Sequence, residues 1–163
     1  ATTDVLGVAE ELPFIDESFD AILCLNVLEH VKDPFRCASE ISRVLKKNGT
    51  LYCVTPLLQP VHGYPNHYYN MTAEGLRNLF CDDLEIIRQF VYKSGKPIHA
   101  LSWFLNSWIN GLPEDMRPEF LQMTVEDLVN DPNSLLGEKF SSQLSESKNF
   151  ELACTTSLIA KKK

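Results

Sequence analysis

Residues 19–55 constrain the fold more than any other part of the sequence, because two kinds of apolar pattern follow one another there. Residues 19–27 are nearly all apolar, as expected of a strand buried on both faces of a parallel sheet. Asp33-Pro34 then supplies a helix N-cap and a first-turn proline. The apolar residues that follow recur at helical spacing: Phe35, Ala38, Ile41, Val44 and Leu45.

A second strand is predicted after this helix. The pair Asn48-Gly49 is a common helix C-terminal signal, and the β-prone residues 50–54 follow it directly. A strand, a helix and a strand of these lengths form a right-handed crossover in an α/β sheet. The predicted fold class is therefore α/β.

The rest of the chain is predicted to add a loop, a helical region and two further strands. Residues 57–70 hold prolines, histidines and tyrosines without any period, which is typical of a functional loop. Residues 84–92 and 150–160 are β-rich and predict strands, whereas residues 97–148 are predicted to be a helical insertion. We expect residues 1–163 to be one partial domain that carries this insertion.

Three shorter patterns predict local contacts. Thr72 is in position to cap a short helix, and Thr124 and Asp127 have the spacing of a capping box. Glu40 and Arg43 are predicted to form a surface pair on one helix.

Composition limits which partners and which cellular compartment we expect. The formal net charge is -7 with a pI near 5.1, so we expect no nucleic-acid partner, because phosphate-tracking surfaces need clustered Lys and Arg. The five cysteines form no C-x-x-C pair, which favours reduced thiols in a cytoplasmic protein. No apolar run approaches the roughly 20 residues of a membrane span, and none is predicted.

Four sequence elements between residues 5 and 56 occur in one order and at one spacing. They are Ala9 to Phe14, Ser18 to Asp20, Leu25 to Val31 and Glu40 to Leu51. Together they resemble the middle of the class I S-adenosylmethionine-dependent methyltransferases that act on small molecules. A later stretch, residues 65–76, resembles a loop in members that modify sugars or other glycan precursors.

The resemblance implies a Rossmann-like methyltransferase sheet. This chain would supply strands three to seven, with strands one and two absent and the helical insertion before the last strand. Ligands of such sheets bind outside the carboxyl ends of the strands. The methionine side of the cofactor, S-adenosylmethionine, would lie against Leu25, Asn26 and Val27. Its adenine would lie against Val8, Ala9 and Glu10.

The sequence departs from the family at the cofactor. Many relatives carry an acidic residue where Val8 stands, and valine cannot accept a hydrogen bond from adenine. The seven glycines are never closer than twelve residues apart, so the chain contains no G-x-G turn of the kind that cradles this cofactor. We therefore expect S-adenosylmethionine binding by these residues alone to be weak or absent.

The missing strands would also leave residues 21–26 as an exposed apolar edge, which stable proteins normally cover. We expect either more chain before Ala1 in the natural protein, or self-association or a partner chain, to cover that edge.

Candidate residues for acceptor binding or base catalysis are His30, His67 and Tyr69, with His62 and Tyr68 beside them. Methyl transfer needs mainly an aligned acceptor, and a base helps only where that acceptor is a hydroxyl. A structural alternative stays open for each of them: His30 would cap the turn after its strand, and the loop aromatics would pack on the end of the sheet.

Glu29 beside His30 raises the question of a divalent metal. Asn26 stands where a further carboxylate would be needed, and an amide is a poorer ligand for a hard cation, so no metal is predicted.

The resemblance thus implies an enzyme that transfers a methyl group to a small-molecule or glycan-like acceptor, with this chain as the C-terminal portion of the domain. The alternative is a non-catalytic, methyltransferase-like binding or scaffold module that has lost the cofactor.

Overall fold

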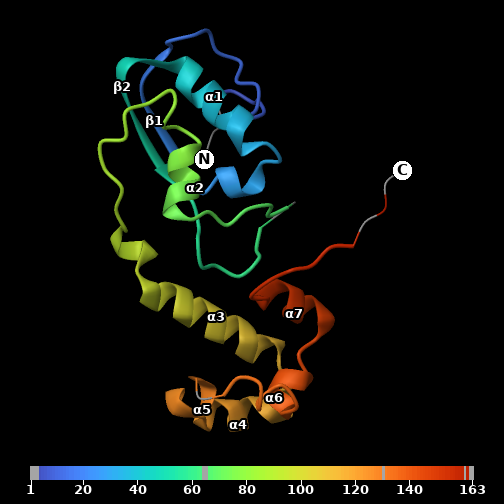
Figure 1. Cartoon of the computed structure of the whole chain (residues 1–163). Coiled ribbons are helices and arrows are strands. Elements are labelled where there is room, and N and C mark those ends of the chain that lie inside the picture. The colour runs from blue at the N-terminus through green and yellow to red at the C-terminus, as the bar shows by residue number, and fades with distance from the viewer. Residues whose placement is uncertain (1–3, 64–65, 130, 160, 162–163) are drawn as a thin grey trace. The chain divides into compact units, whose positions relative to one another are not determined.

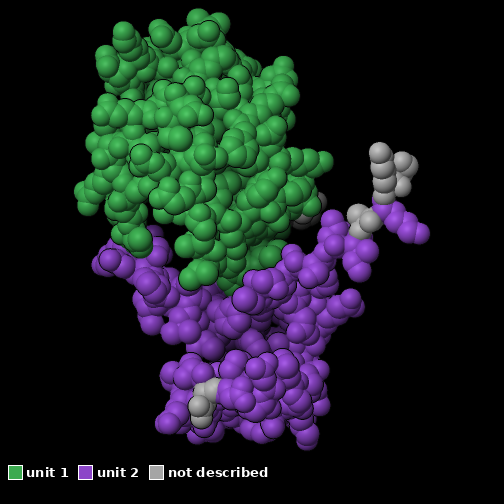
Figure 2. Space-filling model, in the orientation of Figure 1, with its two compact units in different colours: residues 1–92 green, residues 93–163 purple. Residues whose placement is uncertain are grey.

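The computed structural model describes residues 4–63, 66–129, 131–159 and 161. The chain divides into two compact units, residues 1–92 and residues 93–163, which are coloured separately in Figure 2. The boundary falls just before the helical region that the sequence predicts.

A strand, a helix and a second strand form the centre of the first unit, as predicted (Figure 1). Strand β1 (Phe19–Leu25) and strand β2 (Leu45–Val54) pair in parallel, and helix α1 (Pro34–Val44) connects them. From Ala21↔Thr50 to Leu25↔Val54 the strands pair residue by residue. This register brings the carboxyl ends of the two strands to the same edge.

The start of α1 follows the sequence prediction. The Asp33 side chain accepts a 3.0 Å hydrogen bond from the backbone N–H of Arg36, and Pro34 occupies the first turn. One helix face is buried at Cys37 and Ala38, which pack beneath the sheet.

The end of α1 differs from the prediction. The helix stops at Val44 and β2 begins at the next residue, so Asn48-Gly49 does not end it. Asn48 has a φ of +63°, the left-handed conformation that such a pair favours in any context. The pairing with β1 slips between Phe19 and Ala21, and the Asn-Gly pair lies in the irregular part of β2 that this slip creates.

The sheet buries one of its two faces. The side chains of Cys24, Ile22 and Leu51 point to the helical side, whereas Leu23 is 71% exposed and Leu25 48% exposed. The buried residues of this core are Cys24, Leu28, Cys37, Ala38, Ile41, Leu79 and Phe80. Among the described residues, β1 has a strand neighbour on one edge alone.

Two short helices follow the strands of the first unit. The 3-10 turn η1 (Leu28–His30) follows β1, and helix α2 (Ala73–Asn78) follows the loop after β2. The Thr72 side chain accepts a 3.0 Å hydrogen bond from the backbone N–H of Gly75, which confirms the predicted cap.

The strand predicted at residues 84–92 is wrong. This segment is irregular, although Leu84 and Ile86 pack against the core and Phe90 stacks on Tyr52 at 6.2 Å between ring centroids. A strand needs a neighbour for its backbone hydrogen bonds, and this segment pairs with none of the described residues.

The strand predicted at residues 150–160 is also wrong over its described part, since residue 160 lies outside the described residues. Helix α7 (Glu146–Leu152) occupies its beginning, and no strand follows through residue 159. Ser145 caps this helix by accepting a hydrogen bond from the backbone N–H of Lys148 at 3.3 Å, a local signal that outweighs β propensity. The described part thus holds two strands instead of the five that the resemblance implies.

The second unit is helical, as expected of residues 97–148. Its elements are η2 (Lys93–Gly95), α3 (Pro97–Gly111), η3 (Glu114–Met116), α4 (Arg117–Gln122), α5 (Val125–Val129), α6 (Lys139–Ser142) and α7. The predicted capping box is confirmed. The Thr124 backbone N–H donates to Asp127 Oδ2 at 2.7 Å, and the Asp127 backbone N–H donates to Thr124 Oγ1 at 3.2 Å.

Buried apolar side chains give the second unit its own core: Leu112, Met116, Phe120, Phe140 and Leu144. Trp108 stacks on Phe120 and donates its indole N–H to the Phe140 carbonyl at 3.0 Å, so it belongs to this core. Within the described residues, none of the helices combines the length and apolar character needed to cross a membrane.

Candidate functional site

The carboxyl end of β1 carries three of the predicted cofactor residues. Leu25 is 48% exposed and Val27 38% exposed, and Asn26 between them has a φ of +54°. The Asn26 N–H still donates to the carbonyl of Val54 at 2.9 Å, so the last hydrogen bond between the strands holds this left-handed residue in place. Left-handed residues other than glycine are uncommon and gather at functional sites.

The other three predicted cofactor residues form a tight turn near the N-terminus. Val8 is 61% exposed and accepts the N–H of Glu11 at 3.1 Å. Ala9 packs against the core under β1, and Glu10 beside it is half-buried. Of the six predicted cofactor residues, Ala9 is thus the one that packs on the core of the first unit.

A clamp from α1 holds the segment that follows this turn. The Arg43 guanidinium donates two 2.7 Å hydrogen bonds to the Glu40 carboxylate, and further ones to the carbonyls of Leu12 and Phe14 at 3.1 and 2.8 Å. The Leu12 N–H returns a 2.7 Å bond to Glu40. The predicted pair is thus confirmed, and it also fastens residues 12–14 to the helix. The hydrogen bonds from Arg43 lower the pKa of Glu40 to about 2.

Three histidine rings gather beyond the end of β1. The centroid of His30 lies 5.7 Å from that of His62 and 5.5 Å from that of His67, and the latter two lie 4.5 Å apart. His30 ends η1, whereas the other two belong to the loop after β2. The fold therefore unites residues that are far apart in the sequence.

Hydrogen bonds fix the orientation of two of these rings. His30 Nδ1 lies 2.7 Å from the carbonyl oxygen of Asn66 and must donate to it. His67 accepts the His62 backbone N–H at Nδ1, and its Nε2 lies 3.1 Å from the carbonyl oxygen of Tyr69. Both nitrogens of His67 thus hold the loop together, which favours a positioning role for this ring.

The tyrosines fasten the loop to η1. The N–H of Tyr68 donates to the Glu29 carbonyl at 2.7 Å, and the Tyr69 hydroxyl donates to the Lys32 carbonyl at 2.9 Å. His30, His67 and Tyr69, the three predicted acceptor-side residues, therefore lie in one group. Their roles in catalysis stay predictions.

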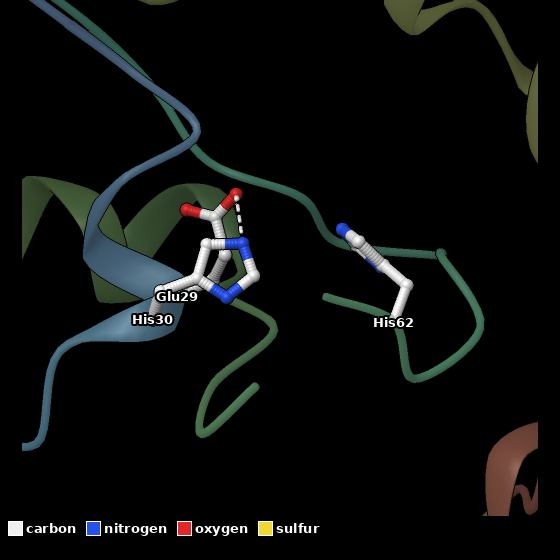
Figure 3. A group of neighbouring side chains, drawn as sticks. All are labelled: Glu29, His30 and His62. Carbon is white, nitrogen blue, oxygen red and sulfur yellow. Dashed lines mark ion pairs between the residues drawn. The ribbon is translucent and has the colours of Figure 1, made fainter. Parts of the chain in front are cut away.

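Glu29 is the residue of this group whose environment the sequence did not reveal. Its side chain is completely buried, and its carboxylate oxygens have no hydrogen-bond partner within the part of the chain that the structure describes. Glu29 Oε1 lies 3.8 Å from His30 Nε2 (Figure 3). An acidic residue directly after a buried strand was the available signal, but its burial depends on the loop that covers η1.

Comparison with known proteins finds a similarity to one family within the first unit. The family described as "Methyltransferase domain" matches residues 2–53. The uncharacterized methyltransferase YcgJ of Bacillus subtilis is 28% identical over 127 residues, which cover 71% of this chain and 49% of that protein. A tRNA U34 carboxymethyltransferase of Campylobacter curvus is 29% identical over 119 residues, covering 66% of this chain and 39% of that protein.

Among solved structures, that of YcgJ aligns with 74% of this chain and with 62% of the YcgJ chain. The TM-score is 0.42 and the sequence identity 20%, a likeness too weak to define the fold. The chain spans about half or less of the length of the curated relatives named above. The matched segment contains the turn at Val8, the clamp and the left-handed Asn26 at the end of β1. Residues 2–53 are therefore similar in sequence to a methyltransferase domain.

Proposed function

We propose that the protein containing this chain transfers a methyl group from S-adenosylmethionine to a small-molecule or glycan-like acceptor. The observation that carries the proposal is the left-handed Asn26 at the carboxyl end of β1, within the segment that matches the methyltransferase domain. Open α/β sheets bind their ligands at this edge, and left-handed residues other than glycine gather at functional sites.

The residues around β1 fit the cofactor. Adenine needs apolar walls and the methionine side needs exposed backbone groups, and Val8, Leu25 and Val27 each offer exposed apolar surface. S-adenosylmethionine supplies a methyl group bonded to a positively charged sulfur. The chain's own residues bind and orient the two reactants, and proximity supplies much of the rate.

On the acceptor side, the histidine and tyrosine group supports recognition of a hydroxylated molecule. His30 is the residue we propose for acceptor contact, because it ends η1, the turn that follows the carboxyl end of β1. His67 and Tyr69 hold the loop from which an acceptor would be bound.

Relatives named tRNA U34 carboxymethyltransferase raise RNA as an acceptor. The net charge of -7 argues against it, because RNA-binding surfaces gather positive charge. A small, uncharged or weakly charged acceptor suits this chain better.

Titration calorimetry with S-adenosylhomocysteine tests the cofactor part of the proposal. It should be run on this chain and on the longest form in which the protein is naturally made. We expect binding by the longer form, with about 2.7 kcal/mol of stabilisation at a ligand concentration 100 times the Kd, and weaker or absent binding by these 163 residues. A longer form that binds nothing would favour the non-catalytic module instead.

The acceptor is tested by transfer of an isotope-labelled methyl group to a panel of sugars, small hydroxy and carboxylic acids, and tRNA. We expect label on a member of the first groups and none on tRNA. His67→Ala should raise the KM for the acceptor by loosening the loop. A variant with unchanged KM and kcat would remove the loop from the acceptor site.

A further inference from the structure

Three side chains in the first unit bring together atoms that commonly bind metal ions. Glu29 and His30 come from η1, and His62 comes from the loop after β2 (Figure 3). One carboxylate oxygen and one ring nitrogen from each histidine lie within 4.8 Å of one another.

Hydrogen bonds to the backbone determine which nitrogen of each imidazole carries the hydrogen. His30 Nδ1 faces the Asn66 carbonyl at 2.7 Å, and His62 Nδ1 faces the Pro60 carbonyl at 2.8 Å. A carbonyl oxygen only accepts, so each Nδ1 carries the hydrogen and each neutral ring has its lone pair on Nε2. Metal-binding histidines are held in the same way, with one nitrogen donating to a carbonyl and the other binding the ion.

The buried carboxylate points to a missing positive charge. Glu29 is 0% exposed, and its oxygens have no hydrogen-bond partner among residues 4–63, 66–129, 131–159 and 161. Leaving a carboxylate buried without a partner is costly, and His30 at 3.8 Å is beyond hydrogen-bond distance. A cation between Glu29 and the two histidines would compensate that charge.

We propose that Glu29, His30 and His62 form a binding site for a divalent transition-metal ion, with zinc as the representative. Two imidazoles and one carboxylate are a donor set that suits zinc and its neighbours, whereas calcium and magnesium prefer oxygen. The three atoms lie within 4.8 Å of one another, and ligand bonds of about 2.0–2.2 Å require them to draw closer when an ion binds. The sequence alone led to the opposite prediction because it offered Asn26 as the third group beside Glu29 and His30, and an amide is a poorer ligand for a hard cation.

The ring of His67 supports the site without binding the ion. It packs at 4.5 Å against His62 and accepts that residue's backbone N–H, so it holds the loop ligand in place. This site does not depend on methyl transfer, and it would exist whether or not the protein binds S-adenosylmethionine.

Cobalt(II) titration of the purified chain, followed by visible absorption, tests the proposal. Exposed thiols also bind such ions, so the reference protein carries Cys81→Ser and Cys154→Ser, the two exposed cysteines. We expect one equivalent of cobalt to give the strong visible bands of a four-coordinate site without the near-ultraviolet bands of thiolate ligation, and zinc to displace it.

His30→Ala and His62→Ala should each weaken binding by more than about 100-fold, beyond the 10–100-fold that loss of an outer partner costs. His67→Ala should weaken cobalt binding by the smaller factor of roughly 10–100-fold, because His67 holds a ligand and does not bind the ion. His99→Ala, an exposed histidine of α3, is the matched control and should bind as the reference does.

Glu29→Gln tests the carboxylate, and circular dichroism shows whether each variant folds. If Glu29→Gln does not fold, the partly exposed His62 still decides the outcome. The proposal is overturned if the reference protein binds no cobalt, if thiolate bands accompany binding, or if His62→Ala binds as tightly as His99→Ala.

Discussion

The guanidinium of Arg43 holds the carboxylate of Glu40 through two hydrogen bonds of 2.7 Å each, one turn apart on α1. Planar, two-pronged contacts of this kind are stronger than ordinary surface ion pairs. Because the same arginine also reaches the Leu12 carbonyl at 3.1 Å, the pair fixes the segment that leads from the turn at Val8 to β1.

This pair predicts a specific dependence of stability on pH. Folding lowers the pKa of Glu40 from 4.5 to about 2, so the ionised carboxylate stabilises the folded state above about pH 4.5. That contribution is lost as the pH falls towards 2. The gap in unfolding free energy between wild type and Glu40→Gln should therefore narrow between pH 4.5 and 2.

Urea unfolding at a series of pH values measures that gap. Glu85→Gln, an exposed glutamate in an irregular segment, is the control and should give a curve parallel to that of the wild type. A constant gap for Glu40→Gln over the whole range would contradict the proposed strength of the contact with Arg43.

Asn26 predicts a contrast between two substitutions. Its φ of +54° is open to glycine but strained for a β-branched residue. Asn26→Val should lower the free energy of unfolding by about 1–2 kcal/mol, whereas Asn26→Gly should stay within about 1 kcal/mol of the wild type. Equal stability of the two variants in denaturant titrations would show that the chain does not turn at this residue.

The core of the second unit predicts a large loss on truncation. Phe120 is 6% exposed and packs between Trp108 and Phe140, so Phe120→Ala should cost about 3–5 kcal/mol of stability. The neighbouring Leu121, 60% exposed, is the control, and its change to alanine should stay within about 0.5 kcal/mol. Hydrogen exchange of α3 amides would report the difference, and similar protection in both variants would argue against this core.

The five free cysteines predict an order of alkylation. Cys81 and Cys154 are exposed and should react first. Cys37 is completely buried, and desolvation raises its pKa to about 12, so it should react only when the protein unfolds. Peptide mapping after brief treatment with iodoacetamide checks this order, and early labelling of Cys37 would contradict its burial.

Local signals were sufficient to predict the first unit's centre. The apolar run before Leu25, the cap at Asp33 and the cap at Thr72 each act within a few residues, so the sequence contains all that is needed to recognise them. The Asn48-Gly49 pair shows the limit of this approach. It predicted the end of a helix, and that prediction is wrong. The left-handed conformation of Asn48 occurs both after helices and within irregular strands, and the pairing with the neighbouring β1 decides between them.

Longer-range features could not be predicted in the same way. Residues 84–92 have strand-forming composition but no neighbour among the described residues with which to pair. The approach of His62 to Glu29 depends on the path of the loop after β2, which no spacing in the sequence expresses. His30, His67 and Tyr69 were each predicted as acceptor-side residues, but the sequence did not predict the contacts that bring their segments together.

The aromatic residues divide between the two units in a way that makes each unit separately observable. Both tryptophans, Trp103 and Trp108, lie in α3, whereas all five tyrosines occur at or before Tyr92. Tryptophan emission therefore reports on residues 93–163, and tyrosine absorbance reports on residues 1–92. A single unmodified sample can thus reveal whether the halves of this chain melt together or apart, and which of them responds first to a ligand.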